Sequence, residues 1–270
     1  MTQRGPRSRG ASRRPPWPFF VLAAIGGAVF VVPLAGLLSR TPWGRLPTLL
    51  TSDVALDAVR LSVVASLGAT LIAALLGVPL AWVLARVEFP GRAVLRGLVL
   101  LPLVLPPVVG GAALLFALGR RGLVGEPLYE ATGLVLPFST WGVVVATTFV
   151  AMPFLVITVE GALRNFDPRF EGAAASLGAG RWMVMRRVTL PMIGPSLAAG
   201  LVLTWARALG EFGATITFAG NLQGRTQTLP LAVYVALETD RDTAVAISLV
   251  MVAVSLAVLV SLRERWWKVA

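Results

Sequence analysis

The sequence of 270 residues contains no cysteine and no histidine. Disulfides and thiol nucleophiles are therefore excluded, as are the usual general base and the common zinc ligands, so we expect no metal site. Lys268 is the only lysine, and no Gly-Lys-Ser/Thr sequence of a phosphate-binding loop is present. The chain thus lacks this route to ATP hydrolysis, and we expect no catalytic residue and no cofactor of its own.

Charge is also scarce, since only 14% of the residues are charged and 56% are hydrophobic. A soluble domain of this size does not carry so little charge, which indicates that the lipid bilayer is the solvent. The net charge of +11 would suggest nucleic acid as the partner of a soluble protein. Here the basic residues lie between apolar stretches, so they indicate membrane orientation and no nucleic-acid partner.

Six apolar stretches are long enough to cross roughly 30 Å of hydrocarbon, which takes about 20 helical residues. They are continuously apolar rather than alternating, and backbone groups in lipid must be satisfied within the segment, so we expect helices and not a barrel. The prediction is an all-α membrane protein, a six-helix transmembrane bundle forming one domain over residues 17–270. The six spans are placed near residues 17–38, 61–85, 98–118, 140–159, 191–219 and 243–262.

The distribution of basic residues predicts the orientation of this bundle. With the N-terminus inside, sixteen basic residues face the cytoplasm: Arg4, Arg7, Arg9, Arg13, Arg14, Arg86, Arg92, Arg96, Arg164, Arg169, Arg181, Arg186, Arg187, Arg263, Arg265 and Lys268. Seven face outward: Arg40, Arg45, Arg60, Arg120, Arg121, Arg225 and Arg241. The excess inside predicts that both termini are cytoplasmic.

The N-terminal arm, residues 1–16, is rich in Arg, Pro, Gly and Ser. We expect it to be disordered and to lie on anionic lipid headgroups. The apolar stretch that follows is too long for a typical signal peptide and has no clear cleavage site after it, so we expect an uncleaved first helix.

A cytoplasmic loop of about thirty residues, 160–190, separates the fourth and fifth spans. Ala173 and Ala174 form a low surface that a groove can approach closely, Gly178 can adopt a positive φ and end a helix, and Pro191 suits the first turn of the next helix. Four residues would suffice to connect two helices, so the extra length predicts a docking partner. The neighbouring arginines Arg181, Arg186 and Arg187 fit either inner-leaflet anchors or contacts with that partner.

The fifth span reaches membrane length only by including Arg207 and Glu211. Spaced four apart on one helix, these residues share a face and can neutralise each other. Gly210 and Gly213 flank the carboxylate and permit a kink or a close helix approach. Two interpretations stay open: a structural ion pair, or an arginine that faces the pathway of an anionic solute and is held in place by Glu211.

The third span contains Pro102, Pro106 and Pro107 within six residues. Prolines remove backbone donors and bend helices. The bend fits either a packing kink or a gate helix that lines a pathway.

The loop resembles the cytoplasmic docking loop of ABC-importer permeases, whose pattern is Glu-Ala-Ala, three residues, Gly, nine residues, Ile-x-Leu-Pro. The residues that match it in register are Ala173, Ala174, Gly178, Val188, Leu190 and Pro191. The departure is that Gly172 occupies the Glu position, whereas the only carboxylate, Glu171, lies one residue earlier. One residue rotates a helical side chain by about 100°, so the resemblance supports the docking role of the loop more than a salt bridge from Glu171 to the partner.

Residues 206–221 and 226–234, together with the run Leu-Pro-Leu-Val-Leu-Pro-Pro at 101–107, resemble molybdate ABC transporter permeases. Sulfate permeases share the Arg and the Gly-Glu pair but typically continue with Tyr-Gly-Ser where this chain has Phe212, Gly213 and Ala214. The resemblance covers most of the chain from the second span onward, and not the N-terminal arm.

The resemblance implies a permease of the type I importer kind in a bacterial inner membrane. It implies a homodimer, two ATPase subunits that bind and hydrolyse ATP-Mg below it, and an extracytoplasmic molybdate-binding protein above it. A sulfate or tungstate permease, an ion-coupled secondary transporter and a non-transporting scaffold are the alternatives.

Overall fold

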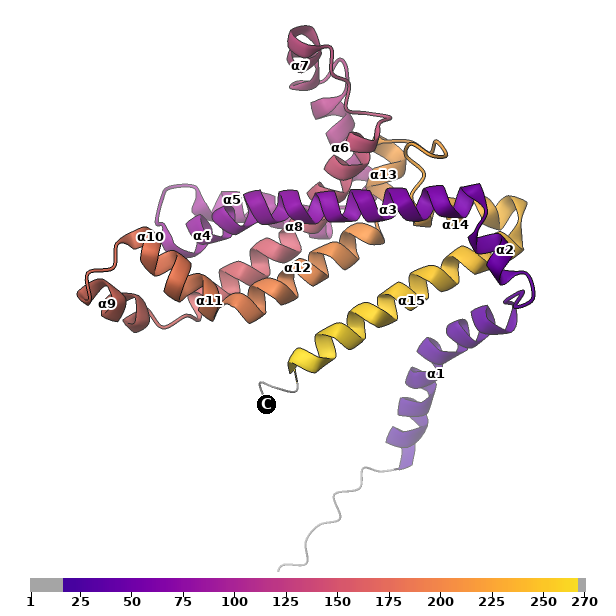
Figure 1. Cartoon of the computed structure of the whole chain (residues 1–270), viewed down its shortest axis with the longest axis horizontal. Coiled ribbons are helices and arrows are strands. Elements are labelled where there is room, and N and C mark those ends of the chain that lie inside the picture. Colours follow the sequence, from indigo (N-terminus) through magenta and orange to yellow (C-terminus); the bar gives the residue numbers. More distant parts are fainter. Residues whose placement is uncertain (1–16, 267–270) are drawn as a thin grey trace, which may run out of the picture. The chain divides into compact units, whose positions relative to one another are not determined.

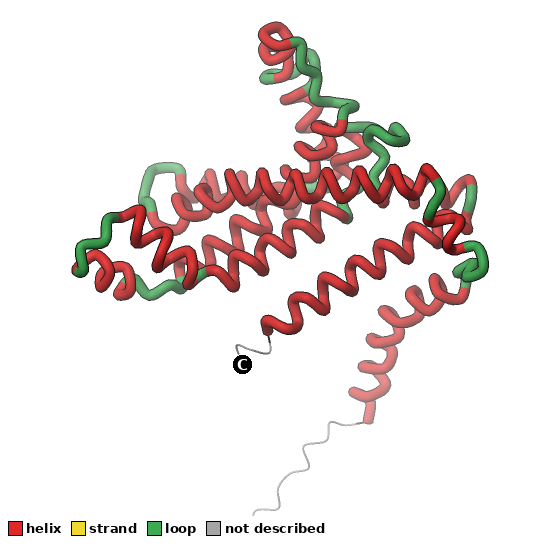
Figure 2. The backbone as a smooth tube through the Cα atoms, in the orientation of Figure 1, coloured by secondary structure: helices red, strands yellow, loops and turns green. Residues whose placement is uncertain are grey.

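The computed structural model describes residues 17–266, with side chains described up to residue 260. The N-terminal arm and Lys268 lie outside the described residues. All regular structure in the described part is helical (Figure 2), so the all-α prediction is confirmed. The chain divides into two units, residues 1–42 and 43–270.

In the first unit, α1 (Trp17–Ser39) matches the first predicted span. Its 23 residues include no charged side chain, and Pro33 lies within it. The helix is long and apolar enough to cross a membrane.

The second unit is built around α8 (Thr140–Arg164). Most of the side chains in the middle of this helix are buried. Two long elements contact α8 and each other: the run formed by α3 (Asp53–Ile72), η1 (Ala73–Gly77) and α4 (Val78–Arg86), and α12 (Gly194–Leu209) (Figure 1). Small residues permit the close approach, since Ala69, Ala151 and Ala208 form one buried cluster between the three.

Two π-helical turns interrupt this framework, and a proline follows two residues after each. These turns are η1, followed by Pro79, and η2 (Met185–Thr189), followed by Pro191. Proline cannot donate to the carbonyl four residues earlier, and a wider turn is one way to accommodate the lost bond. Both segments therefore continue through their prolines as helix.

The third predicted span is not one helix, which corrects the expectation of a continuous helix over 98–118. The chain forms α5 (Arg92–Val104), which contains Pro102, and a separate α6 (Pro107–Leu118). Each proline disfavours the helical conformation of the residue before it. Leu105 and Pro106 are accordingly extended, with ψ of 134° and 130°, so the prolines break the helix where only a bend was expected.

The fifth predicted span is also discontinuous. The helical stretch from α10 (Arg181–Val184) through η2 and α11 (Leu190–Met192) meets α12 at a bend of 70°. Helix α12 then ends at Leu209, and α13 (Gly213–Phe218) begins after a three-residue break. The expectation of one helix carrying both Arg207 and Glu211 is therefore wrong, because Glu211 lies in the break.

The last predicted span lies within α15 (Arg241–Trp266). A short helix that hydropathy did not reveal, α14 (Leu229–Thr239), packs against it. Between them, the carboxylate of Asp240 accepts hydrogen bonds from the Thr243 hydroxyl and the Asp242 N–H, and the Thr243 hydroxyl lowers the pKa of Asp240. Smaller helices complete the described chain: α2 (Leu46–Leu50), α7 (Gly125–Thr132) and α9 (Arg169–Ser176).

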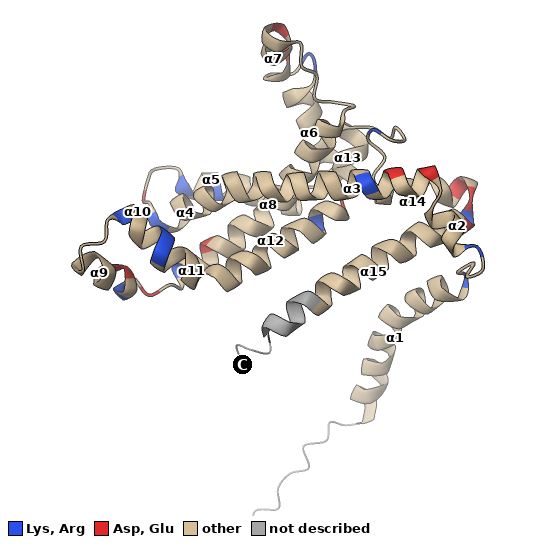
Figure 3. Cartoon of the chain, viewed as in Figure 1, with Lys and Arg blue, Asp and Glu red and all other residues tan. Residues whose placement is uncertain are grey.

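Four helices in the described part are long and apolar enough to span a membrane, or five if the bent pair counts as one span. The predicted count of six is therefore not confirmed by helix length. Figure 3 shows few charged residues along the middle of α3, α8 and α12, and a cluster of them where α4, α5, α9 and α10 come together. That cluster coincides with the end predicted to face the cytoplasm.

Candidate functional site

Two regions hold the candidate residues: the α9 loop, and the place where the broken helices meet. In the loop, α9 begins after Asp167, whose Oδ1 accepts a hydrogen bond from the Arg169 N–H at 2.9 Å. Its end is fixed by Gly178, which has a φ of +84°. Gly178 N–H donates to Ala175 O at 3.0 Å and Ala179 N–H to Ala174 O at 3.1 Å. These paired bonds form a Schellman motif, so the helix stop expected at Gly178 is confirmed.

The outer face of α9 carries no carboxylate and, beyond Arg169 in its first turn, only small residues. Gly172 and Ala173 are exposed, and a Cβ added at Gly172 would meet nothing within 4 Å. Leu177, 90% exposed, directly follows α9, and Trp182, 70% exposed, lies in α10. A hollow of about 420 Å³ runs between the end of α9 and the α10–η2 stretch, and Leu177, Met183 and Val188 line it. An apolar surface of this kind suits a protein partner.

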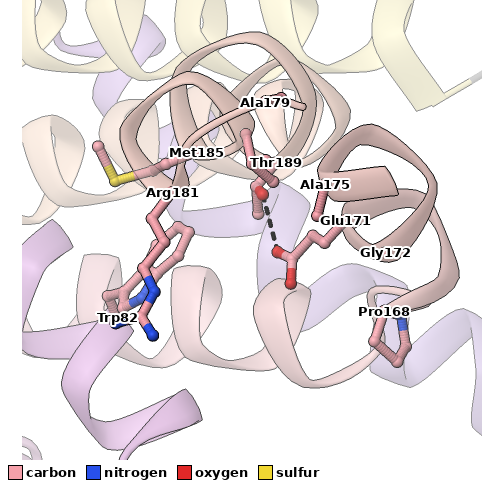
Figure 4. Close-up of a pocket in the computed structure, with 10 residues that line it drawn as sticks. Trp82, Pro168, Glu171, Gly172, Ala175, Ala179, Arg181, Met185 and Thr189 are labelled. Carbon is pink, nitrogen blue, oxygen red and sulfur yellow. Dashed lines mark hydrogen bonds between the residues drawn. The ribbon is translucent and has the colours of Figure 1, made fainter. Parts of the chain in front are cut away.

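Glu171 points away from that face, into the chain. Its Oε1 lies 3.2 Å from Arg86 Nη2 and accepts a hydrogen bond from Thr189 Oγ1 at 2.8 Å. Figure 4 shows Glu171 turned towards Thr189 in a pocket of about 510 Å³. Neither partner was identified from the sequence. The one-residue shift of the carboxylate was the available signal, because it predicts a different direction for the side chain.

A second polar cluster joins the ends of α4, α5 and α8 near the loop. Glu160 is buried and forms ion pairs with Arg96 and with Arg164, the latter at 3.1 Å. Arg92 Nε donates to the carbonyl of Leu84 at 2.9 Å, which satisfies an end group of α4. Sequence reasoning treated these arginines only as orientation signals.

At the break between α12 and α13, Glu211 is bonded on both oxygens. Oε2 lies 2.6 Å from Arg207 Nη1, and Oε1 accepts from the Ala214 N–H at 2.8 Å. The Glu211 side chain is 1% exposed, whereas that of Arg207 is 29% exposed. The ion pair expected from the sequence is confirmed, although a helix break, and not a continuous helix face, brings the two together.

The two broken spans meet at this point. A Cβ added at Gly213 would lie 2.7 Å from Pro107 Cβ, and one added at Gly111 would lie 2.8 Å from the carbonyl oxygen of Ala214. Helix α13 thus lies directly on α6, and one predicted pathway residue, Gly213, contacts the predicted gate proline Pro107. Gly210 is exposed in the break, where the nearest atom to an added Cβ is 3.7 Å away.

Residues 75–265 match the family of binding-protein-dependent transport system inner membrane components. The chain belongs to this family. The permeases of this family are subunits of ABC importers, and the apolar helices described above fit a multi-pass inner-membrane protein. Among the residues with described side chains, no group of three or more carboxylates could hold a metal ion.

Relatives within this permease family cover nearly the whole chain. The molybdenum transport system permease protein ModB of Mycobacterium tuberculosis is 50% identical over 93% of this chain and 94% of its own length. ModB of Escherichia coli K12 is 42% identical over 81% of this chain and 95% of its own length. The sulfate transport system permease protein CysT of E. coli K12 is more distant, at 35% identity over 87% of this chain and 86% of its own length.

A solved structure shows the same permease fold. It is the crystal structure of a bacterial ABC transporter involved in the import of the acidic polysaccharide alginate, with a TM-score of 0.74. The match covers 92% of this chain and 93% of that one, at 20% sequence identity. The fold is therefore that of an ABC importer permease.

The contact between Gly213 and Pro107 gives a stability prediction. Replacing Gly213 with Val places side-chain atoms against Pro107, and overpacking of this kind costs about 1–3 kcal/mol. We expect a lower thermal unfolding midpoint of the purified, detergent-solubilised chain.

Gly210→Ala is the matched control on the other side of Glu211, and it leaves the midpoint near that of the wild type because the site has space. Equal midpoints for Gly213→Val and the wild type would contradict the close packing of α6 and α13.

Proposed function

We propose that this chain is the membrane-spanning subunit of an importer that moves molybdate into the cytoplasm of a bacterium. The observation that carries this proposal is the 50% identity, over nearly the full chain, to a molybdenum transport permease. The sulfate permease is more distant at 35% identity, and the Phe212-Gly213-Ala214 stretch follows the molybdate pattern. Tungstate, nearly the same in size and charge, is a second candidate substrate, and sulfate is a third.

In the proposed assembly two copies of the chain form the pathway. Each copy crosses the membrane six times, with both termini in the cytoplasm, and the broken spans α5–α6 and α12–α13 count as crossings or parts of them. Broken helices are tolerated at membrane depth where they are buried in protein or line a cavity. The contact of α6 with α13 supports this placement.

The outer face of α9 is the proposed docking surface on the cytoplasmic side. Two ATP-binding subunits dock on the α9 faces of the two copies of the chain. The small residues of α9, its Schellman end and the exposed Leu177 support a fit into an apolar groove. A binding protein delivers the anion to the outer loops. ATP binding and hydrolysis in the partner subunits shift this chain between two packings of its helices, and the chain itself makes and breaks no covalent bond.

Arg207 is the proposed contact for the anion. Its Nη1 is paired with Glu211, and it is the more exposed member of the pair. A guanidinium has five N–H donors, so the ion pair leaves donors for an oxyanion. Glu211 holds Arg207 in position through a carboxylate that is itself fixed to the start of α13.

The transport proposal is tested by reconstituting the chain with its ATP-binding subunit and binding protein in liposomes. We expect saturable, ATP-dependent uptake of molybdate that tungstate competes and sulfate competes poorly. Uptake of sulfate alone would support the role as an importer permease and contradict molybdate as the substrate. Uptake driven by an ion gradient without ATP would instead support a secondary transporter.

Removing Arg207 tests its role in the pathway. Arg207→Ala leaves a buried Glu211 unpaired, so the informative variant is Arg207→Met combined with Glu211→Gln, which removes both charges. We expect an assembled complex whose apparent affinity for molybdate in transport falls about 10- to 100-fold, as for loss of a charged hydrogen bond.

The control for this pair is Glu211→Gln alone, which keeps the guanidinium and is expected to retain more of the uptake. Wild-type uptake by the double variant would show that the pair is only structural.

Gly178 tests the docking role. Val at a φ of +84° is strained by about 1–2 kcal/mol and disrupts the end of α9. We expect Gly178→Val to lose co-purification with the ATP-binding subunit, or to hydrolyse ATP without uptake. Gly180→Val is the matched control, because Gly180 has a φ of −68° and free space around it. Normal coupled uptake by Gly178→Val would contradict the docking proposal.

A further inference from the structure

We infer that Glu171 is a positioning residue that works inside the chain, as a strut that fixes α9 to the end of α4 and to η2. This inference rests on the proposed function for its consequence, because the strut would carry movement of the docked α9 into the membrane helices. The one carboxylate of α9 would then connect this helix to the rest of the chain, and the docking face would have no negative charge.

The contacts of Glu171 join segments that are far apart in the sequence. Arg86 is the last residue of α4, and Thr189, which is fully buried, is the last residue of η2. Arg86 Nη2 and Thr189 Oγ1 both donate hydrogen bonds to the same carboxylate oxygen, Oε1 of Glu171. The side chains of Arg86 and Glu171 are each only 26% exposed, so their attraction is less screened than that of a surface pair.

Arg86 also holds the turn that leads into α9. Its guanidinium lies over the ring of Phe166, 5.6 Å from the ring centroid. The ring of Phe166 in turn packs against that of Phe170, in the first turn of α9, with the two centroids 6.1 Å apart. The same guanidinium therefore contacts residues both before and within the docking helix. Movement of α9 as a body must move Arg86, or break both contacts.

From Arg86 the connection continues into the packed core. The preceding Leu84 is fully buried with Leu155 and Val159 of α8. The Leu84 carbonyl is bonded by Arg92, and Arg96 of α5 is paired with Glu160 of α8. The end of α4 is thus fixed to α5 and α8 by both apolar and charged contacts, and it cannot shift alone.

The docking face itself offers no carboxylate in place of Glu171. A Cβ added at Gly172 would meet nothing within 4 Å, so a carboxylate at this position would have free space around it. The exposed residues that follow on α9, Ala173, Ala175 and Ser176, are uncharged. A Glu restored at position 172 has room, which makes it possible to separate the two roles of a carboxylate on this helix.

The test compares Glu171→Arg, Arg86→Glu and the swapped pair Glu171→Arg/Arg86→Glu in the reconstituted complex. Each single variant places like charges together, and the swap restores opposite ones. We expect each single variant to lower the molybdate transported per ATP hydrolysed by about three- to thirtyfold, and the swap to recover most of that loss. A merely structural role would not move this ratio in complexes that assemble normally.

Two further variants sharpen the result. Glu171→Gln/Gly172→Glu moves the carboxylate one residue along α9, about 100° around the helix, and we expect the coupling to stay low. The exposed pair Arg45–Asp242, at 2.8 Å and remote from α9 in the sequence, provides the matched control swap Arg45→Asp/Asp242→Arg. That swap is expected to leave the transport ratio at the wild-type value.

Hydrogen exchange of residues 169–176 in the same complexes separates this inference from the transport proposal. Faster exchange in both single variants, with recovery in the swap, is expected whatever solute is carried. Unchanged exchange in the single variants, or no recovery in the swap, overturns the strut even where uptake is normal. Recovery of coupling in Glu171→Gln/Gly172→Glu also overturns it, because the carboxylate would then act on the partner. Failure of wild-type uptake overturns only the transport proposal.

Discussion

The carboxylate of Glu211 holds together the break on which the candidate pathway depends. A bilayer offers no water to satisfy backbone groups, so a helix that stops within it must find partners in the protein. Glu211 provides one such partner, since one of its oxygens accepts the Ala214 N–H, while the other oxygen pairs with Arg207. Its negative charge suits the start of α13, and the positive charge of Arg207 suits the end of α12. The break is therefore neutral, ordered and fixed against α6, where Pro107 touches Gly213.

Near the α9 loop, other ion pairs fix the helix ends in a similar way. Buried Glu160 pairs with Arg96 of α5, and half-buried Glu171 pairs with Arg86 of α4. Helix α8 connects this region with the break. Helix α8 packs on α4 near the loop and on α12 and α13 towards the break. Close packing transmits displacement because a packed interior has few voids to absorb it. In the proposed assembly, an ATP-binding subunit docked on α9 and an anion bound at Arg207 would thus both act on the helices that pack around α8.

Much of the fold could be predicted from the sequence because hydropathy and glycine act locally. Long apolar runs gave α1, α8 and α15, and Gly178 gave the helix stop after α9. The breaks could not be located from hydropathy, because the run through Pro106 and Pro107 stays apolar while the backbone turns extended. Arg207 and Glu211 were paired from their spacing, although the helix ends between them. The partners of Glu171 lie 85 and 18 residues away, a proximity that only tertiary packing creates.

The central claim is that the break at Arg207 and Glu211 lies on the path of an oxyanion. The chain has no cysteine, so a single Gly210→Cys variant can be labelled in the complete complex with a small, charged thiol reagent. The account predicts that Cys at 210 is modified during ATP turnover and that saturating molybdate slows the modification. Leu256→Cys, on an exposed apolar position of α15, is predicted to stay unmodified. Absence of modification at 210 in a complex that still takes up molybdate, or modification that molybdate does not slow, would contradict the claim.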